Sequence, residues 1–365
     1  QIDSIGIATI VTCLVIISGT VIFFKQRLFV AFADIAQLLA KLAIHLNVVH
    51  AGLVPKSVEL RLFNNGRNEV VRAHYLERDA SSHSKEDKLQ DILIVPGFTA
   101  EATLMAELVS SMNLPPEIRV CIMELPLHGK NVINFDGTNF PNPQDILDYT
   151  FAFVEAVGLG KQKNSEKEIP LNIIGYSLGG GICFRMLTER PPGTYRKVVL
   201  LAPASKETMD DTFNQISSEN PRKVHGWETF EECKEFFTKT AGGFYPNKLP
   251  HIALVGIHRQ REITYNKGFF TDYFRGFKFE SSSDETRQKI LEQYKTPVLV
   301  ACGDRDNCIS MKKCKHHFKD YGKYFSFHEI FDTGHVGGPA TGRTMTTIVQ
   351  VFGPVARDFL FSDKL

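Results

Sequence analysis

The stretch Gly175–Gly179, which reads Gly-Tyr-Ser-Leu-Gly, places Ser177 between two glycines at the end of an apolar run. This spacing is typical of a nucleophile elbow, where a serine stands on a strained turn between a strand and a helix. Side chains at the two glycine positions would collide with that turn. Gly180 and Gly181 follow, and glycines lower helix stability, which indicates a close approach of the backbone to another segment. The pattern predicts Ser177 as a nucleophile.

A serine hydroxyl is a poor nucleophile until a histidine removes its proton, and a carboxylate holds that histidine in the required tautomer. In strand-turn-helix enzymes of this kind, the chain order is serine, acid, histidine. Asp304 and Asp306 follow the predicted strand 297–301, and His335 lies in a loop after the predicted strand 324–330. The order predicts His335 as the base, with either aspartate as the acid, because loop position alone does not choose between them.

The remaining histidines are weaker candidates for the base. His128 precedes the serine, so it breaks the expected order. Five others lie in an insertion or on a lysine-rich helical surface where a solvated face is expected: these are His225, His251, His258, His316 and His317.

Acyl transfer from a serine also requires hydrogen-bond donors aimed at the tetrahedral oxyanion. The backbone N–H of Leu178, directly after the nucleophile, is one such donor. The second is expected in the loop Val95–Thr99, after the third strand, where the N–H of Phe98 is the best candidate. Main-chain donors need no particular side chain, so both assignments rest on position.

Alternating strand and helix patterns must position these residues. A hairpin around Asn64-Asn65-Gly66 is predicted at a sheet edge. Later apolar runs are continuous rather than alternating, which indicates strands buried on both faces of a mostly parallel sheet, and hence an α/β fold. The predicted strands are 58–63, 70–76, 91–95, 119–123, 171–175, 198–201, 297–301 and 324–330, with a helix over 145–157.

The chain divides into a core and an insertion. The core is predicted over 55–204 and 296–365, and the insertion over 205–295 forms a helical lid subdomain. It lies at the carboxyl ends of the strands, where open α/β sheets bind ligands. Its aromatic residues are mostly expected to form its own core: Phe230, Phe236, Phe237, Phe244, Tyr245, Phe269, Phe270, Tyr273, Phe274 and Phe277.

The first 54 residues differ from the rest. Residues 5–24 carry no charge, and a helix of that length reaches about 30 Å, so residues 1–27 are predicted to form a transmembrane anchor. Lys25 and Arg27 follow, which favours a cytoplasmic side, or its topological equivalent, for the remainder. Residues 28–54 gather most of their polar side chains on one helical stripe. Such a helix lies along the membrane interface or packs under the domain, and the adjacent anchor favours the interface.

Composition excludes several classes of function. The formal net charge is +1 over 365 residues, which leaves no basic excess for nucleic-acid binding. Seven unevenly spaced cysteines indicate a reducing compartment rather than a disulfide framework. No cofactor is implied, because the glycine-rich stretches lack the phosphate-loop and dinucleotide patterns. No metal is implied either, since Cys308, Cys314 and His316 lack the paired short spacing of zinc sites.

Over residues 56–362 the chain resembles the α/β-hydrolase superfamily, and more narrowly its membrane-anchored monoacylglycerol lipases. Five ordered motifs carry the resemblance: Pro96-Gly97-Phe98, Glu124-Leu-Pro-Leu-His128-Gly129, Gly175-x-Ser177-x-Gly179, Gly303-x-x-Asp306 and Gly334-His335. The resemblance implies an α/β-hydrolase fold with a lid, selects Asp306 over Asp304 as the acid, and implies hydrolysis of monoacylglycerols or other single-chain lipids.

The chain departs from the family pattern at three positions. Pro96 replaces a histidine, Glu124 an aspartate and Leu127 a glycine. These positions shape the pocket floor and the strand ends, so they bear on substrate and rate more than on reaction class. Two other interpretations stay open: an esterase or thioesterase for soluble acyl substrates, and an accessory subunit of a membrane protein complex that keeps the fold for interaction.

Overall fold

The computed structural model describes a large part of the chain. The described residues are 31–32, 34–39, 41–64, 67–80, 91–98, 100–129, 131, 143–161, 168–211, 215, 229–240, 254–255, 258, 289, 293–340 and 344–362. The predicted anchor, residues 1–27, and most of the predicted lid, 205–295, lie outside them. Among the described residues, no helix combines the length and apolar character needed to cross a bilayer.

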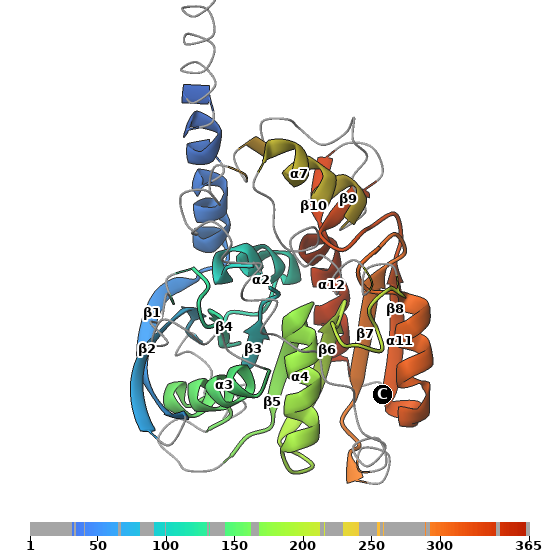
Figure 1. Cartoon of the computed structure of the whole chain (residues 1–365). Coiled ribbons are helices and arrows are strands. Elements are labelled where there is room, and N and C mark those ends of the chain that lie inside the picture. Colours follow the sequence, from blue (N-terminus) through green and yellow to red (C-terminus); the bar gives the residue numbers. More distant parts are fainter. Residues whose placement is uncertain are drawn as a thin grey trace, which may run out of the picture.

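An eight-stranded sheet forms the centre of the molecule, in the order β1-β2-β4-β3-β5-β6-β7-β8 (Figure 1). Strand β2 pairs antiparallel with β1 and β4, and the other pairs are parallel. Each predicted strand is present, and the predicted hairpin forms one sheet edge. The bounds are β1 Val54–Asn64, β2 Arg67–Arg78, β3 Ile92–Val95, β4 Val120–Met123, β5 Leu171–Tyr176, β6 Tyr195–Leu201, β7 Val298–Gly303 and β8 Phe325–Ile330.

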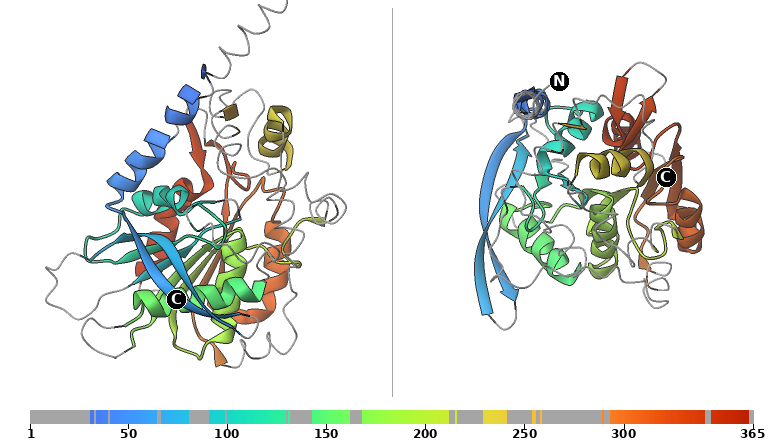
Figure 2. Two further views of the ribbon diagram at one scale, coloured as in Figure 1. Left: turned by 60° about the vertical axis from the view of Figure 1, so that its left-hand side comes forward. Right: turned by 45° about the horizontal axis from the view of Figure 1, so that its top comes forward.

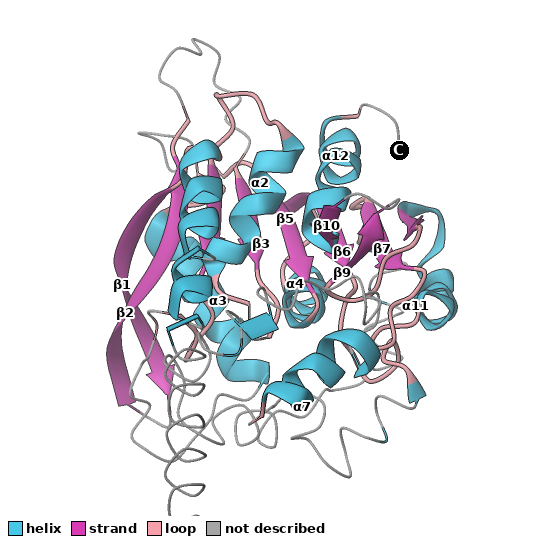
Figure 3. Ribbon diagram, turned by 90° about the horizontal axis from the view of Figure 1, so that it is seen from above, coloured by secondary structure: helices cyan, strands magenta, loops and turns pink. Residues whose placement is uncertain are grey.

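Helices cover both faces of this sheet (Figure 3). One face packs against α3 (Pro143–Val157), α4 (Leu178–Glu189) and α11 (Met311–Phe318). The other face packs against α2 (Ala106–Met112) and α12 (Ile348–Phe361). The predicted α/β class with a mostly parallel sheet is confirmed.

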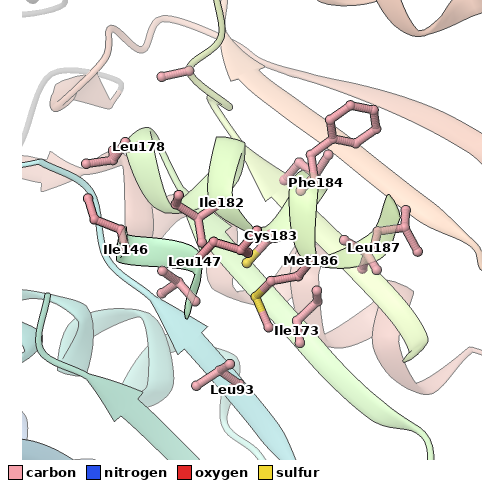
Figure 4. Packing of buried hydrophobic residues seen from close by; sticks show 14 of the residues in the cluster. Leu93, Ile146, Leu147, Ile173, Leu178, Ile182, Cys183, Phe184, Met186 and Leu187 are labelled. Carbon is pink, nitrogen blue, oxygen red and sulfur yellow. The ribbon is translucent and has the colours of Figure 1, made fainter. Parts of the chain in front are cut away.

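Successive residues of each central strand serve opposite layers of the core. Leu93 and Ile173 pack with α3 and α4 (Figure 4). Their neighbours Ile92, Ile94 and Ile174 pack with α2 and α12 on the other side. All five side chains are fully buried. Because both faces are covered, these strands appear in the sequence as continuous apolar runs.

The N-terminal helix, residues 31–50 with positions 33 and 40 outside the description, stands beside α2 (Figure 2). Its carboxyl end is anchored in the core through Val48, and the following Ala51 and Leu53 continue that contact. The region predicted as an interfacial helix is therefore connected to the core of the α/β domain.

Three smaller elements lie beyond the carboxyl ends of the central strands (Figure 1). They are α7 (Phe230–Glu235), the π-helix η2 (Phe236–Thr240) and a two-stranded sheet of β9 (Gly337–Ala340) and β10 (Thr344–Thr347). Helix α7 begins with a capping box between Thr229 and Glu232. Its Cys233 packs with Phe237 and Leu254, so these residues form a small core of their own. The β9–β10 hairpin was not predicted, because its glycine- and threonine-rich strands show no apolar alternation.

One expectation about α11 is wrong. His316 is exposed as expected, but His317 is buried among the rings of Phe184, Phe318 and Tyr321. The lysines around it suggested a solvated face. Tertiary packing instead places His317 on the buried face of α11, together with Met311, Cys314 and Phe318.

Candidate active site

Ser177 forms the turn between β5 and α4. Its backbone angles are φ 53° and ψ −115°, a region that costs a residue with a side chain about 1–3 kcal/mol. The two flanking glycines make the turn feasible. A Cβ on Gly175 would lie 2.2 Å from the Gly179 oxygen, and one on Gly179 would lie 2.1 Å from the Val95 oxygen. The predicted elbow geometry is therefore present.

Three side chains from separate loops meet at this elbow. The Nε2 atom of His335 lies 3.0 Å from Oγ of Ser177. On the other side of the ring, Nδ1 of His335 donates to Oδ2 of Asp306 at 2.8 Å. This is the arrangement in which a histidine can accept the serine proton while the carboxylate holds the ring and stabilises its charged form.

The Asp306 carboxylate is fixed from behind. Its side chain is inaccessible to solvent, and its Oδ1 accepts hydrogen bonds from the N–H groups of Cys308 and Ile309, both at 2.8 Å. The two main-chain donors hold one oxygen, so the other faces His335. The orientation of the acid is set before any substrate binds.

Asp304, the alternative acid, has a different position. Its Oδ1 accepts a hydrogen bond from the N–H of Thr333 at 3.0 Å, and the Arg305 guanidinium pairs with Asp332 at 2.7 Å. Both contacts tie the loop after β7 to the loop that carries His335. Asp304 thus joins the two loops, and Asp306 is the acid that faces the histidine.

Tyr176 is a site residue that the sequence motif did not reveal. Its hydroxyl donates to the backbone oxygen of His335 at 2.7 Å, and the two rings stack with centroids 5.6 Å apart. Tyr176 occupies a variable position of the Gly-x-Ser-x-Gly pattern. Only the fold shows that it reaches a residue 159 positions later.

We expect Tyr176→Phe to lower the free energy of unfolding by about 1 kcal/mol, because a partly buried hydrogen bond is lost while the ring is kept. The kcat for an ester should fall several-fold, since the His335 backbone loses a fixed partner, with KM little changed. Urea unfolding and steady-state kinetics measure both quantities. An unchanged kcat would show that stacking alone positions His335.

The predicted oxyanion donors belong to two segments that adjoin Ser177. Leu178 is the first residue of α4, so its N–H lies at the positive end of the helix dipole. Phe98 follows Gly97, and a Cβ on Gly97 would lie 3.1 Å from Cβ of Ser177. The loop after β3 thus lies close to Ser177, in the region where a second donor is expected.

His128 is fully buried, and its Nδ1 bonds to the backbone oxygen of Pro126 at 2.9 Å. Burial lowers its pKa to about 4. It is therefore neutral at physiological pH. The ring lies edge-on to Phe98, with centroids 5.6 Å apart, so it packs against the loop after β3.

This pKa predicts how stability depends on pH. Between about pH 6.5 and pH 4 the unfolded chain binds a proton at His128 and the folded protein does not. The free energy of unfolding should therefore decrease as the pH is lowered from about 6.5 to about 4. His128 should account for up to about 3 kcal/mol of this decrease. Urea unfolding of the wild type and of His128→Gln at pH 7 and pH 4.5 isolates the contribution as a double difference. Equal pH dependence in both proteins would contradict the prediction.

The residues considered for zinc are not brought together as a set. Cys314 lies with its sulfur 3.7 Å from that of Cys302, and His316 is exposed. Asp306, Cys308 and His335 do offer ligand atoms within 4.8 Å of one another. However, the histidine and the aspartate are already hydrogen-bonded to each other, and burial raises the pKa of the Cys308 thiol well above its usual value, which disfavours the thiolate that binds metals.

The other histidines lie elsewhere. His258 is placed beside Phe230 of α7, and His225 and His251 fall outside the described residues. The six cysteines in the described part of the chain are all buried and form no disulfide.

The sheet order, the elbow and the hydrogen-bonded triad define a serine hydrolase of the α/β-hydrolase superfamily. Residues 86–331 match the family described as serine aminopeptidase, S33. The match covers more than half of the chain and includes Ser177 and Asp306, so this protein belongs to that family. His335 lies just beyond the matched residues.

Solved structures share the fold. A proposed lipase from Acinetobacter baumannii AYE superposes with a TM-score of 0.62 at 15% identity, covering 88% of this chain and 95% of that one. A membrane phospholipase A, a bacterial virulence factor, gives 0.55 at 16%, covering 90% and 91%. Carboxylesterase CesB from Bacillus subtilis gives 0.54 at 10%, covering 82% and 92%. No curated protein matches the chain in sequence.

Proposed function

We propose that this protein is a membrane-anchored serine hydrolase that cleaves the carboxylic ester of a monoacylglycerol, or of a similar single-chain lipid. The observation that carries the proposal is the hydrogen-bonded series Ser177–His335–Asp306 on a strained elbow. No other combination of a serine, a histidine and an acid predicted from the sequence meets in this way in the described part of the chain.

The reaction follows from the positions of these groups. Oγ of Ser177 attacks the ester carbonyl as His335 takes its proton, and the N–H groups of Phe98 and Leu178 bind the oxyanion. His335 then gives the proton to the leaving glycerol oxygen, which releases the alcohol and leaves an acyl-enzyme. A water molecule, deprotonated by His335, attacks the acyl carbon, and the collapse of the second oxyanion returns the proton to Ser177 and frees the fatty acid.

The lipid substrate is supported by the sequence resemblance and by the N-terminal residues. The uncharged run 5–24 would hold the enzyme on the bilayer in which such a lipid dissolves. Lys25 and Arg27 favour a catalytic part on the cytoplasmic side or its topological equivalent. An acyl chain would then reach the site from the membrane without crossing water.

The N-terminal helix supports contact with the bilayer along its length. Seven of its large apolar side chains fall within a sector of about 120° at about 100° per residue, and these seven are 41–67% exposed. A water-facing helix surface normally carries polar residues there. The uncovered apolar set is Phe32, Ile35, Leu38, Leu39, Leu42, Leu46 and Val49.

Part of the remaining surface of this helix packs against the protein. Ala36 packs with Val255 and Phe230, and Gln37 is buried. Burial raises the pKa of Glu101, and the positive charge of Lys41 offsets part of this increase. Lys41 therefore interacts electrostatically with a residue of the domain. One face thus packs on the domain and the other remains for the bilayer. The two interpretations of residues 28–54 are therefore compatible.

A depth measurement tests this contact. In full-length protein with Cys13→Ser, a nitrobenzoxadiazole label on Leu42→Cys or Leu46→Cys should shift to the blue in phosphatidylcholine vesicles, and acyl-chain spin labels should quench it. The same label on His45→Cys, an exposed position between the two sectors, should respond much less. Equal responses at positions 42 and 45, or none at 42 and 46, would contradict a lipid-facing sector.

Two other substrate classes remain as outcomes of the same assay. The family description names a peptidase, and a soluble acyl ester or thioester would need the anchor only for location. A third outcome is an accessory subunit of a membrane protein complex that retains the fold without turnover.

The deciding experiment uses the full chain in detergent micelles. We expect a fluorophosphonate to label Ser177, and kcat/KM for a monoacylglycerol to exceed that for 4-nitrophenyl acetate, an acyl thioester and an aminoacyl 4-nitroanilide. Preference for the short ester or the thioester would favour the soluble-substrate alternative, and preference for the anilide would favour a peptidase. Absence of labelling would reject an active hydrolase and favour the accessory subunit.

A further inference from the structure

The loop after β3 must keep a fixed position relative to Ser177, because its Phe98 N–H is the second proposed oxyanion donor. The loop is tightened by a hydrogen bond from the Ala100 N–H to the Gly97 oxygen at 3.1 Å. Gly97 itself stands against Ser177. What fixes the outer end of this loop therefore affects where the donor points.

The carboxylate of Glu124 holds that outer end. Its Oε1 accepts a hydrogen bond from the N–H of Ala102 at 3.0 Å. Glu124 directly follows β4 and is buried. The carboxyl group rests against Gly129, where the φ of +52° favours glycine and where a Cβ would lie 2.6 Å from Cδ of Glu124. The side chain is thus confined between the loop and this turn.

His128, one residue before Gly129, holds the other end of the loop. Its fully buried ring meets the Phe98 ring edge-on, with an interplanar angle of 73°. The turn from Glu124 to Gly129 therefore contacts the oxyanion loop twice, once through a hydrogen bond at Ala102 and once through the ring of Phe98.

The turn is itself rigidly supported. Nδ2 of Asn131 donates to the Glu124 backbone oxygen at 2.8 Å, and the Tyr149 hydroxyl donates to the same oxygen at 3.2 Å. Oδ1 of Asn131 accepts a hydrogen bond from the His74 N–H at 2.6 Å. These bonds connect the turn to α3 and to β2. The position of Glu124 is thus fixed relative to the central sheet and not only relative to another loop.

We infer that Glu124 is a positioning residue for the oxyanion hole: by holding Ala102 it fixes the loop whose Phe98 N–H meets the developing negative charge. The inference rests on the proposed function. Its consequence is that Glu124 acts mainly on the transition state, since donors aimed at the oxyanion matter little for binding the ground-state ester.

The length of the side chain is the sharpest test. In Glu124→Asp the carboxylate retreats by about one C–C bond, about 1.5 Å, so the bond to the Ala102 N–H is broken while the charge is kept. We expect kcat per active site, titrated with a fluorophosphonate, to fall about 10- to 100-fold, with KM within about twofold. The Ki of an alkyl boronic acid, whose tetrahedral adduct occupies the oxyanion hole, should rise by a similar factor.

Glu77→Gln is the matched control. Glu77 is equally buried, but it pairs with Lys56 and Arg119 and lies opposite Cys121, near the start of β4 and away from the carboxyl edge. This variant should lose stability without losing kcat per titrated site or boronate affinity. A Glu124→Asp enzyme with unchanged boronate affinity, or a control that loses as much, would overturn the inference. A wild type that binds the boronate but cleaves no ester would count against the proposed function alone.

Discussion

Ser177→Ala is expected to reduce ester turnover by at least about 10⁴-fold, because the substitution removes the hydroxyl that His335 contacts and that forms the acyl-enzyme in the proposed reaction. The remaining rate should reflect the oxyanion donors and binding, which the substitution leaves in place. Alanine is as small as serine at the strained φ of 53°, so the elbow should keep its conformation. Loss of activity would therefore report the chemistry and not the fold.

The measurement is kcat/KM for a monoacylglycerol in micelles, together with fluorophosphonate labelling and the free energy of unfolding. Ser326→Ala serves as the control, because Ser326 lies on β8 and its Oγ bonds to the Val298 oxygen. The control should label and turn over normally. Turnover by Ser177→Ala above about one-hundredth of the wild-type rate would place the nucleophile elsewhere.

Asp306→Asn is expected to lower kcat by about 10³- to 10⁴-fold with little effect on KM. The asparagine oxygen would remain with the two main-chain donors at Cys308 and Ile309, so its NH₂ group would face His335. Nδ1 of the histidine must then accept a hydrogen bond instead of donating one. The proton moves to Nε2, and the ring can no longer take the proton of Ser177.

The control for this change is Asp304→Asn. Asp304 accepts from the Thr333 N–H and does not contact the histidine in the structure, so its amide should cost less than about tenfold in kcat. Steady-state kinetics on both variants separate the two acids. A larger loss of kcat in Asp304→Asn than in Asp306→Asn would show that Asp304, and not Asp306, is the acid.

Much of the fold was predictable from local patterns. The continuous apolar runs identified the parallel strands, because strands covered on both faces need apolar side chains at every position, as Ile92, Leu93 and Ile94 show. The pattern failed where packing overrides local composition. His317 lies among lysines yet is buried, and the β9–β10 hairpin after His335 has no apolar alternation to reveal it.

The candidate site divides in the same way. The glycines of the elbow can be recognised in the sequence because they lie within two residues of Ser177 and a side chain at either position would collide with the backbone. The supports of the site are long-range contacts. Tyr176 reaches the backbone of His335, and Glu124 reaches the N–H of Ala102. Neither contact has a periodicity or a spacing, so no local pattern could predict it.

The order of serine, acid and histidine along the chain, together with the strands before them, was sufficient to name Ser177 and His335 and to leave two aspartates. Loop position does not distinguish those aspartates, and the family resemblance selects Asp306. The tertiary structure supplies the physical reason, which is a hydrogen bond between loops that lie 29 residues apart. Main-chain donors at Cys308 and Ile309 turn Asp306 toward the ring, whereas the Thr333 N–H occupies Asp304. Local composition selects residue types, but the direction in which a carboxylate points is decided by the backbone that folds around it.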